Sequence, residues 1–196
     1  MNNPINQYLN QIQINLNTGV AKEHTHRPAL VHLLETLFPA INAINEPKRI
    51  ECGSPDLVIL DTQADNMPLG YFEAKDIGVS LESALKTEQL ERYLDSLHNL
   101  ILTDYLEFRW FVEGKSQMTV RLAEVDKAGI LKPLPDQFAA FKQMLDIFIH
   151  AEVITIRNPE ELAARMAKIA RLMRGLIFKA YQQEKTGALH NQFESF

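Results

Sequence analysis

The sequence predicts an α/β domain, because segments with helical spacing of apolar residues alternate with short strand-like runs. Helical spacing opens the chain, and after Pro47 it gives way to short apolar runs bounded by glycine and polar loops. Helical spacing then returns before two more strand-like runs. The order of helix, strands, helix and strands indicates a sheet with helices packed against it.

Two helices are expected before residue 40. In the first, from Asn2 to Leu16, apolar residues recur every three or four positions, and Asn17-Thr18-Gly19 then ends the helix. The second begins near His24 and ends at Pro39, with Pro28 tolerated only in the first turn.

Three strands are expected after Pro47, in the stretches RIECG, PDLVILD and PLGYFEAK. Gly53-Ser54 and a polar loop over residues 62–66 separate them, and two of the three should form a hairpin. Because the apolar runs in PDLVILD and PLGYFEAK are almost continuous, both faces of these strands should be covered.

The remaining chain continues this alternation. The expected elements are a helix over residues 83–97, strands in LHNLILTD and LEFRWFVEG, and a helix over residues 134–149. A last helix should begin at Asn158, an N-cap residue followed by proline and two acids, and run to about Glu184. We therefore expect a core over residues 1–130 and C-terminal helices over residues 131–196.

The charge distribution argues against a protein that coats nucleic acid by bulk attraction. The net charge is −5, with 13 Lys and Arg against 21 Asp and Glu in residues 1–156 and 7 against 3 in residues 157–185. The basic residues of the last helix form either a solvated face or a surface that follows phosphates.

Composition also bounds where the protein works. No apolar run approaches the roughly 18 to 20 residues that span a bilayer, and the N-terminus lacks the features of a signal peptide. The single Cys52 cannot form an internal disulfide. We expect a cytoplasmic protein without membrane association.

A candidate metal site is formed by Asp56, Glu73 and Lys75. Side chains at i and i+2 share one face of a strand, so Glu73 and Lys75 must point to the same side, and Asp56 joins them if the two strands pair. Two carboxylates on an apolar sheet repel each other and lose hydration unless a cation lies between them. We therefore expect a metal ion held by Asp56 and Glu73.

Oxygen ligands without His or Cys suit Mg²⁺, with Mn²⁺ as a substitute, rather than zinc. Such an ion would polarise a phosphate and lower the pKa of an attacking water. Lys75 would orient that water or neutralise charge in the transition state. The alternative is a solvent-facing Glu73–Lys75 pair on an edge strand, but the surrounding apolar runs favour the metal site.

Five stretches between Gly19 and Gly114 resemble, in the same order, a known family. They are KEHTHRPALVHLLE, NEPKRIECGSPDLVIL, PLGYFEAKDIG, QLERY and NLILTDYLEFRWF. The family is the N-terminal PD-(D/E)xK nuclease domain of single-chain restriction-modification enzymes, types IIG and ISP. The resemblance implies a restriction-endonuclease-like core, with a central mixed β-sheet flanked by helices and a C-terminal helical extension toward a connector. The chain departs at Thr103-Asp104-Tyr105, where the family usually has Thr-Asn-Gly, so this turn must differ.

The resemblance adds two candidate catalytic residues. Glu23 matches an acidic residue that the family often places near the metal. The alternative is an acid at the start of a helix, stabilised by the helix dipole. Gln89 and Tyr93 match a Q-x-x-x-Y element whose Gln contacts DNA or the site, and their spacing puts them on one helix face. The candidate catalytic set is thus Asp56, Glu73, Lys75, Glu23 and Gln89.

Other notable residues receive structural interpretations. His24 and His26 are expected at the surface or in a cap, and Cys52 is expected to be a small buried residue. Glu46 is either a satisfied strand-end residue or a further acid near the site.

These observations predict a Mg²⁺-dependent endonuclease that hydrolyses double-stranded DNA as the cleavage module of a type II-like, site-specific restriction-modification enzyme. No S-adenosylmethionine motif or target-recognition region occurs in these residues. The resemblance implies methyltransferase and target-recognition domains downstream in the same longer polypeptide, so the chain looks like an excised domain or a stand-alone version. The alternative is a catalytically inactive nuclease-fold module that binds DNA or docks. The complete Asp56, Glu73 and Lys75 set favours the active enzyme.

Overall fold

The computed structural model describes residues 3–47, 50 and 52–151, together with the isolated residues 163, 166, 167, 170 and 174. The chain divides into two compact units, Met1–Val153 and Ile154–Phe196. The first unit extends past residue 130, where the sequence placed the end of the core, because helix α5 (Phe138–His150) packs against the sheet. The helix expected from Asn158 lies outside the described residues, apart from the five isolated ones.

The core of the first unit is a six-stranded mixed sheet in the order β1 to β6. The strands are β1 (Ile41–Asn45), β2 (Leu57–Asp61), β3 (Met67–Ala74), β4 (Asn99–Thr103), β5 (Glu107–Val112) and β6 (Lys115–Arg121). All neighbours are antiparallel except β3 and β4, which run parallel. A short ribbon of β7 (Ala123–Val125) and β8 (Leu131–Pro133) follows, and a 3-10 turn, Pro135–Gln137, leads into α5.

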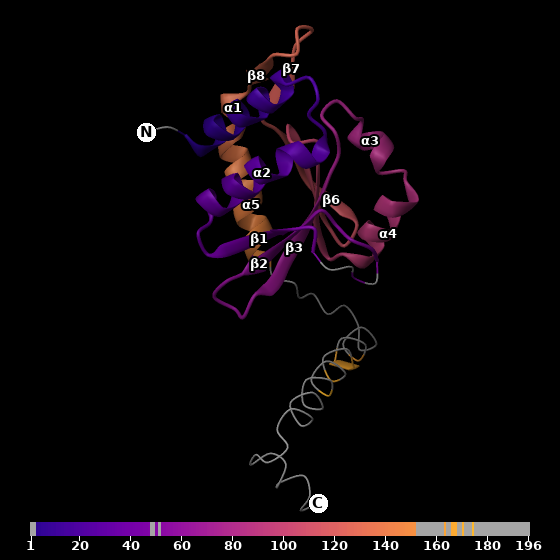
Figure 1. Cartoon of the computed structure of the whole chain (residues 1–196). Coiled ribbons are helices and arrows are strands. Elements are labelled where there is room, and N and C mark those ends of the chain that lie inside the picture. Colours follow the sequence, from indigo (N-terminus) through magenta and orange to yellow (C-terminus); the bar gives the residue numbers. More distant parts are fainter. Residues whose placement is uncertain are drawn as a thin grey trace, which may run out of the picture. The chain divides into compact units, whose positions relative to one another are not determined.

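Helices cover both faces of this sheet (Figure 1). One face carries α1 (Pro4–Asn17), α2 (Glu23–Leu37) and α5, and the other carries α3 (Leu81–Ala84) and α4 (Glu88–Ser96). Strand β4 shows the division, because Ile101 lies in the larger core while its neighbours Leu100 and Leu102 lie in the smaller one. The α/β class predicted from the sequence is confirmed.

The helices α3 and α4 form the crossover that joins the parallel strands β3 and β4. The sequence predicted a single helix over residues 83–97, and this was wrong. Thr87 ends the first helix and starts the second, since its hydroxyl donates to the carbonyl of Ala84 over 2.7 Å and accepts from the Leu90 amide over 3.4 Å.

The strand predictions were correct for the central strands and wrong at the edges. The hairpin β2–β3 and the strands β4 and β5 were expected, whereas β1, β6, β7 and β8 were not. The strand expected in RIECG falls partly on residues 49 and 51, which lie outside the described residues; Ile50 and Gly53 form an isolated bridge. Strand β6 was not predicted because only Val120 among its residues is buried, so its sequence shows a weak apolar pattern.

A buried polar residue ties α5 to the sheet. The Asn99 amide donates to the carbonyls of Leu69, over 2.8 Å, and Phe148, over 2.9 Å, and accepts from the Trp110 indole over 2.7 Å. Gly70 allows the close approach, because a Cβ at this position would lie 2.5 Å from the ring of Phe148. Helix α5 is therefore an integral part of the core.

No helix in the described part of the chain is both long and apolar enough to span a bilayer.

Candidate functional site

The β2–β3 hairpin brings Asp56 to the end of β3. Leu57 lies opposite Phe72, so Asp56, one residue earlier, comes beside Glu73 and Ala74. The amide of Ala74 donates to Asp56 Oδ2 over 2.8 Å. The pairing that the sequence required for Asp56 to approach Glu73 and Lys75 is thus present.

Glu73 is the most deeply buried acid of this cluster, with 2% of its surface exposed. Its Oε1 accepts from Lys75 Nζ over 2.7 Å and from Gln89 Nε2 over 3.1 Å. Its Oε2 is buried and has no hydrogen-bond partner among the described residues. A buried carboxylate oxygen without a donor is unfavourable, so this oxygen is open to a cation or a donor from outside the chain.

Burial and the neighbouring charge of Asp56 raise the pKa of Glu73 to about 7, although Lys75 acts in the opposite direction. The pKa of Asp56 is also raised, chiefly by burial, despite the Ala74 amide and the guanidinium of Arg27. Both pKa shifts reflect the hydration that the carboxylates lose on burial, and nearby negative charge adds to each, from Asp56 at Glu73 and from Glu23 at Asp56. A positive charge placed between them would oppose both shifts.

Lys75 continues β3 by one residue, and its amide donates to the carbonyl of Thr103 over 2.8 Å. This pairing holds the backbone at the point where Glu73 and Lys75 point to the same side, as predicted. The Lys75 side chain is 21% exposed, so its ammonium group lies at the edge of the site.

Gln89 enters the site from α4. Its Nε2 donates to Glu73 and lies 3.3 Å from the Tyr93 hydroxyl, so the two residues share a helix face as their spacing predicted. Gly53 also lies against Tyr93, and a Cβ at this position would come within 2.9 Å of the hydroxyl.

Glu23 reaches the cluster through Arg27, a residue to which the sequence analysis assigned no role. Arg27 Nη2 lies 2.7 Å from Glu23 Oε1 and also donates to Asp56 Oδ1. Arg27 Nη1 donates to Glu46 Oε1 over 3.1 Å and to Asn45 Oδ1 over 3.3 Å. The i, i+4 spacing of Glu23 and Arg27 was the available signal for the first pair.

Two tyrosines hold the start of α2. The Tyr105 hydroxyl donates to the carbonyl of Glu23, and the Tyr8 hydroxyl donates to the carbonyl of Tyr105, each over 2.7 Å. Tyr105 adopts a φ of 69°, the conformation that glycine would adopt easily in the family's Thr-Asn-Gly turn. Here Tyr105 takes the left-handed conformation at this turn, and its hydroxyl group also holds the backbone of Glu23.

His26 corrects an expectation. It was expected at the surface or in a cap, but it is 2% exposed and packs against the ring of Tyr105 with centroids 5.1 Å apart. Its neighbour His24 is exposed, and Cys52 is buried as predicted. The apolar face of α2 extends further than the leucine spacing indicated, because Tyr105 covers its first turn.

Among the described residues, the carboxylate cluster by itself does not supply three protein ligands for a metal ion. Within residues 3–47, 50 and 52–151, no group of three or more His, Cys, Asp and Glu is arranged to hold a metal ion. Mg²⁺ typically takes one or two carboxylates and keeps several waters. The Asp56 and Glu73 pair, with the open Oε2 of Glu73, fits this requirement and contains neither the His nor the Cys that is typical of zinc sites.

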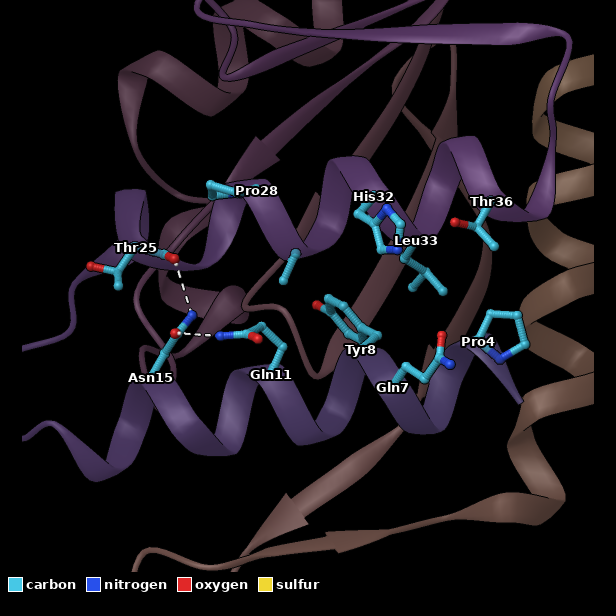
Figure 2. A pocket seen from close by; sticks show the side chains of 11 residues that line it. Pro4, Gln7, Tyr8, Gln11, Asn15, Thr25, Pro28, His32, Leu33 and Thr36 are labelled. Atoms are coloured by element: carbon cyan, nitrogen blue, oxygen red, sulfur yellow. Dashed lines mark hydrogen bonds between the residues drawn. The ribbon is translucent and has the colours of Figure 1, made fainter. Parts of the chain in front are cut away.

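A separate groove lies between α1 and α2 (Figure 2). Its lining mixes apolar residues such as Pro4 and Leu33 with polar ones, and none of the described residues that line it is Asp, Glu, Lys or Arg. The polar residues include Gln7, Gln11, Asn15, Thr25 and His32. The Asn15 amide crosses from α1 to the carbonyl of Thr25 on α2 over 3.1 Å. None of the five candidate catalytic residues lines this groove.

Comparison with known proteins identifies a shared fold. A chain in the cryo-EM structure of a DrdV–DNA complex superposes with a TM-score of 0.57 and 17% sequence identity over 91% of this chain. This chain therefore shares the fold of one part of that chain. The present chain spans 17% of the length of that chain. No family model matches the sequence, and no curated protein matches it significantly.

Proposed function

We propose that this chain hydrolyses phosphodiester bonds of double-stranded DNA with Mg²⁺, or Mn²⁺ in its place, bound by Asp56 and Glu73. The observation that carries the proposal is the buried Oε2 of Glu73, which has no partner in the described part of the chain and lies in a cluster with Asp56. A hard cation is the group that best satisfies two such carboxylates. The fold shared with a chain from a DNA complex supports DNA as the substrate.

When bound, the ion would polarise the scissile phosphate and lower the pKa of the attacking water. Lys75 has three donors, of which Glu73 takes one, so the others can orient that water or neutralise charge on the phosphate. Gln89 holds Glu73 Oε1 and so leaves Oε2 available. Glu23 orders Arg27 and adds negative charge near Asp56.

We further propose that the chain is the cleavage module of a restriction-modification enzyme with type II-like, site-specific activity. Methyltransferase and target-recognition domains of the same polypeptide would then choose the DNA sequence, and the enzyme would act in the cytoplasm. The coverage of only 17% of the DrdV chain is consistent with one module of a larger protein.

A second candidate function is a nuclease-fold module that binds DNA or docks without cutting. One observation favours it, namely that Arg27 already supplies positive charge to Asp56 and Glu23. A cluster of this kind can be a purely structural ion-pair network.

Calorimetric titration of Mn²⁺, with and without duplex DNA, separates the two candidates. We expect the wild type to bind Mn²⁺, Glu73→Gln and Asp56→Asn to bind it weakly, and the control Asp61→Asn, at the other end of β2, to bind as the wild type does. Plasmid should be cut in Mg²⁺ or Mn²⁺, and Ca²⁺ should bind without supporting efficient cleavage. If the wild type binds no divalent ion even with DNA present, the enzyme proposal is wrong and the inactive module remains.

A further inference from the structure

We propose that Arg27 is an internal counter-cation that competes with the divalent ion for Asp56 and thereby sets the affinity of the site for that ion. The inference rests on the proposed function, since it concerns the same cation site. It is carried by the position of the guanidinium group, which contacts Asp56, one of the two carboxylates proposed to hold the ion.

Arg27 is buried, and its charge is directed at the acids of the cluster. Its side chain is 4% exposed, and one nitrogen, Nη2, contacts both Glu23 and Asp56. Asp56 Oδ2 is engaged by the Ala74 amide, so Oδ1 is the oxygen that Arg27 and a divalent ion would share. The positive charge of Arg27, in hydrogen-bond contact with Asp56, opposes the binding of a cation to the same carboxylate.

The guanidinium group has acceptors other than Asp56. Arg27 Nη1 already donates to Glu46 and Asn45, and Glu46 is 69% exposed, so this carboxylate can follow a small movement of the arginine. Releasing Asp56 therefore leaves Arg27 paired with Glu23 and Glu46, which avoids an unpaired buried charge.

The present arrangement of Arg27 is also incompletely satisfied. Its Nε–H is buried and has no hydrogen-bond partner among the described residues. A buried donor without an acceptor weakens the preference for this one orientation. Arg27 is held at Asp56 by a charged hydrogen bond to Oδ1, and a divalent ion bound to Oδ1 would compete for the same oxygen.

Replacing Arg27 with a neutral residue should therefore strengthen metal binding. For Arg27→Met, which keeps the bulk of the side chain, we expect Mn²⁺ to bind roughly tenfold more tightly or better. Arg27→Lys keeps the charge and should bind within about threefold of the wild type. A residue that merely orients Asp56 for the metal would produce the opposite result, weaker binding by Arg27→Met.

The experiment is calorimetric titration of Mn²⁺ into the full chain at about pH 8, where protons compete little for the carboxylates. Arg109→Met is the matched control, because Arg109 is also a partly buried arginine bridging two acids, Glu107 and Glu82, but its strand is separated from that of Glu73 by β4. We expect unchanged Mn²⁺ affinity for this control. Arg27→Gln, which removes the charge but keeps donors for Glu23, takes the place of Arg27→Met if the latter does not fold.

The outcomes are distinguishable. Tighter Mn²⁺ binding by Arg27→Met or Arg27→Gln than by the wild type supports the inference. Equal or weaker binding by both variants, with normal binding by the wild type, overturns the role of Arg27 and leaves the nuclease proposal standing. If neither the wild type nor any variant binds Mn²⁺, both the role of Arg27 and the nuclease proposal are wrong.

Discussion

Gln89 on α4 donates a hydrogen bond to Glu73 Oε1 on β3 over 3.1 Å, and thereby links the crossover helix to the carboxylate cluster. Lys75 donates to the same oxygen over 2.7 Å. The two donors hold one oxygen of Glu73 and leave the other, Oε2, without a partner in the described chain. Helix α4 therefore helps to determine which oxygen of Glu73 lacks a hydrogen-bond partner.

Gln89→Ala should reduce DNA cleavage by roughly tenfold, because a hydrogen bond to a charged group is lost. Gln89→Glu should be worse, since a second carboxylate beside Glu73 would raise its pKa further. Single-turnover cleavage of plasmid in Mg²⁺ measures both. Gln117→Ala is the control, because the side chain of this exposed glutamine on β6 donates to the carbonyl of Lys115 and lies outside the carboxylate cluster. Equal losses for Gln89→Ala and Gln117→Ala would contradict a role for Gln89.

Lys75→Ala should reduce cleavage by roughly 10²- to 10³-fold while Mn²⁺ binding persists. The reason is that Lys75 is proposed to act on the water or phosphate and is not a ligand of the ion. Its side chain is partly exposed, so the fold should survive the change. Circular dichroism and cleavage rates, compared with those of the exposed control Lys86→Ala, test this. Full cleavage by Lys75→Ala would remove Lys75 from the proposed site.

Glu73→Gln should change how stability depends on pH in the absence of divalent ions. The pKa of Glu73 is raised from 4.5 to about 7 in the folded state, so its contribution to stability is full below pH 4.5 and is lost as the pH rises to about 7. The variant does not suffer this loss. As the pH rises from 4.5 to 7, the unfolding free energy of the wild type should therefore fall by about 3 kcal/mol relative to that of Glu73→Gln.

Urea unfolding in a chelating buffer, from about pH 4 to pH 8, measures this difference. The exposed variant Glu124→Gln, on β7, is the control and should follow the wild type. A constant offset between Glu73→Gln and the wild type across the whole range would show that Glu73 does not titrate as stated. Added Mn²⁺ should reverse the order of stability, because only the wild type retains both carboxylates.

Asn99→Ala should lower the unfolding free energy by about 2 to 4 kcal/mol, since it leaves the buried carbonyls of Leu69 and Phe148 and the Trp110 indole without their partner. Urea unfolding monitored by tryptophan fluorescence measures this. Asn10→Ala, at an exposed position of α1, should be nearly neutral. A neutral Asn99→Ala would mean that α5 does not depend on this network.

The sequence by itself determined the central hairpin and the geometry of its acids. Continuous apolar runs predicted strands covered on both faces, and the i, i+2 rule placed Glu73 and Lys75 on the same side. These are local properties of a strand, so no knowledge of the rest of the fold was needed. The spacing of Gln89 and Tyr93 on one helix face was predictable for the same reason.

The tertiary structure decided what the cluster contains besides the predicted residues. Arg27 meets Asp56 across 29 positions of sequence, and His26 is buried because Tyr105, far along the chain, covers it. The edge strands β1 and β6 bury few apolar side chains, so their sequences carry little pattern, and they exist because a neighbouring strand offers hydrogen bonds. Contacts between distant segments depend on how whole elements pack, and periodicity along the chain does not encode that information.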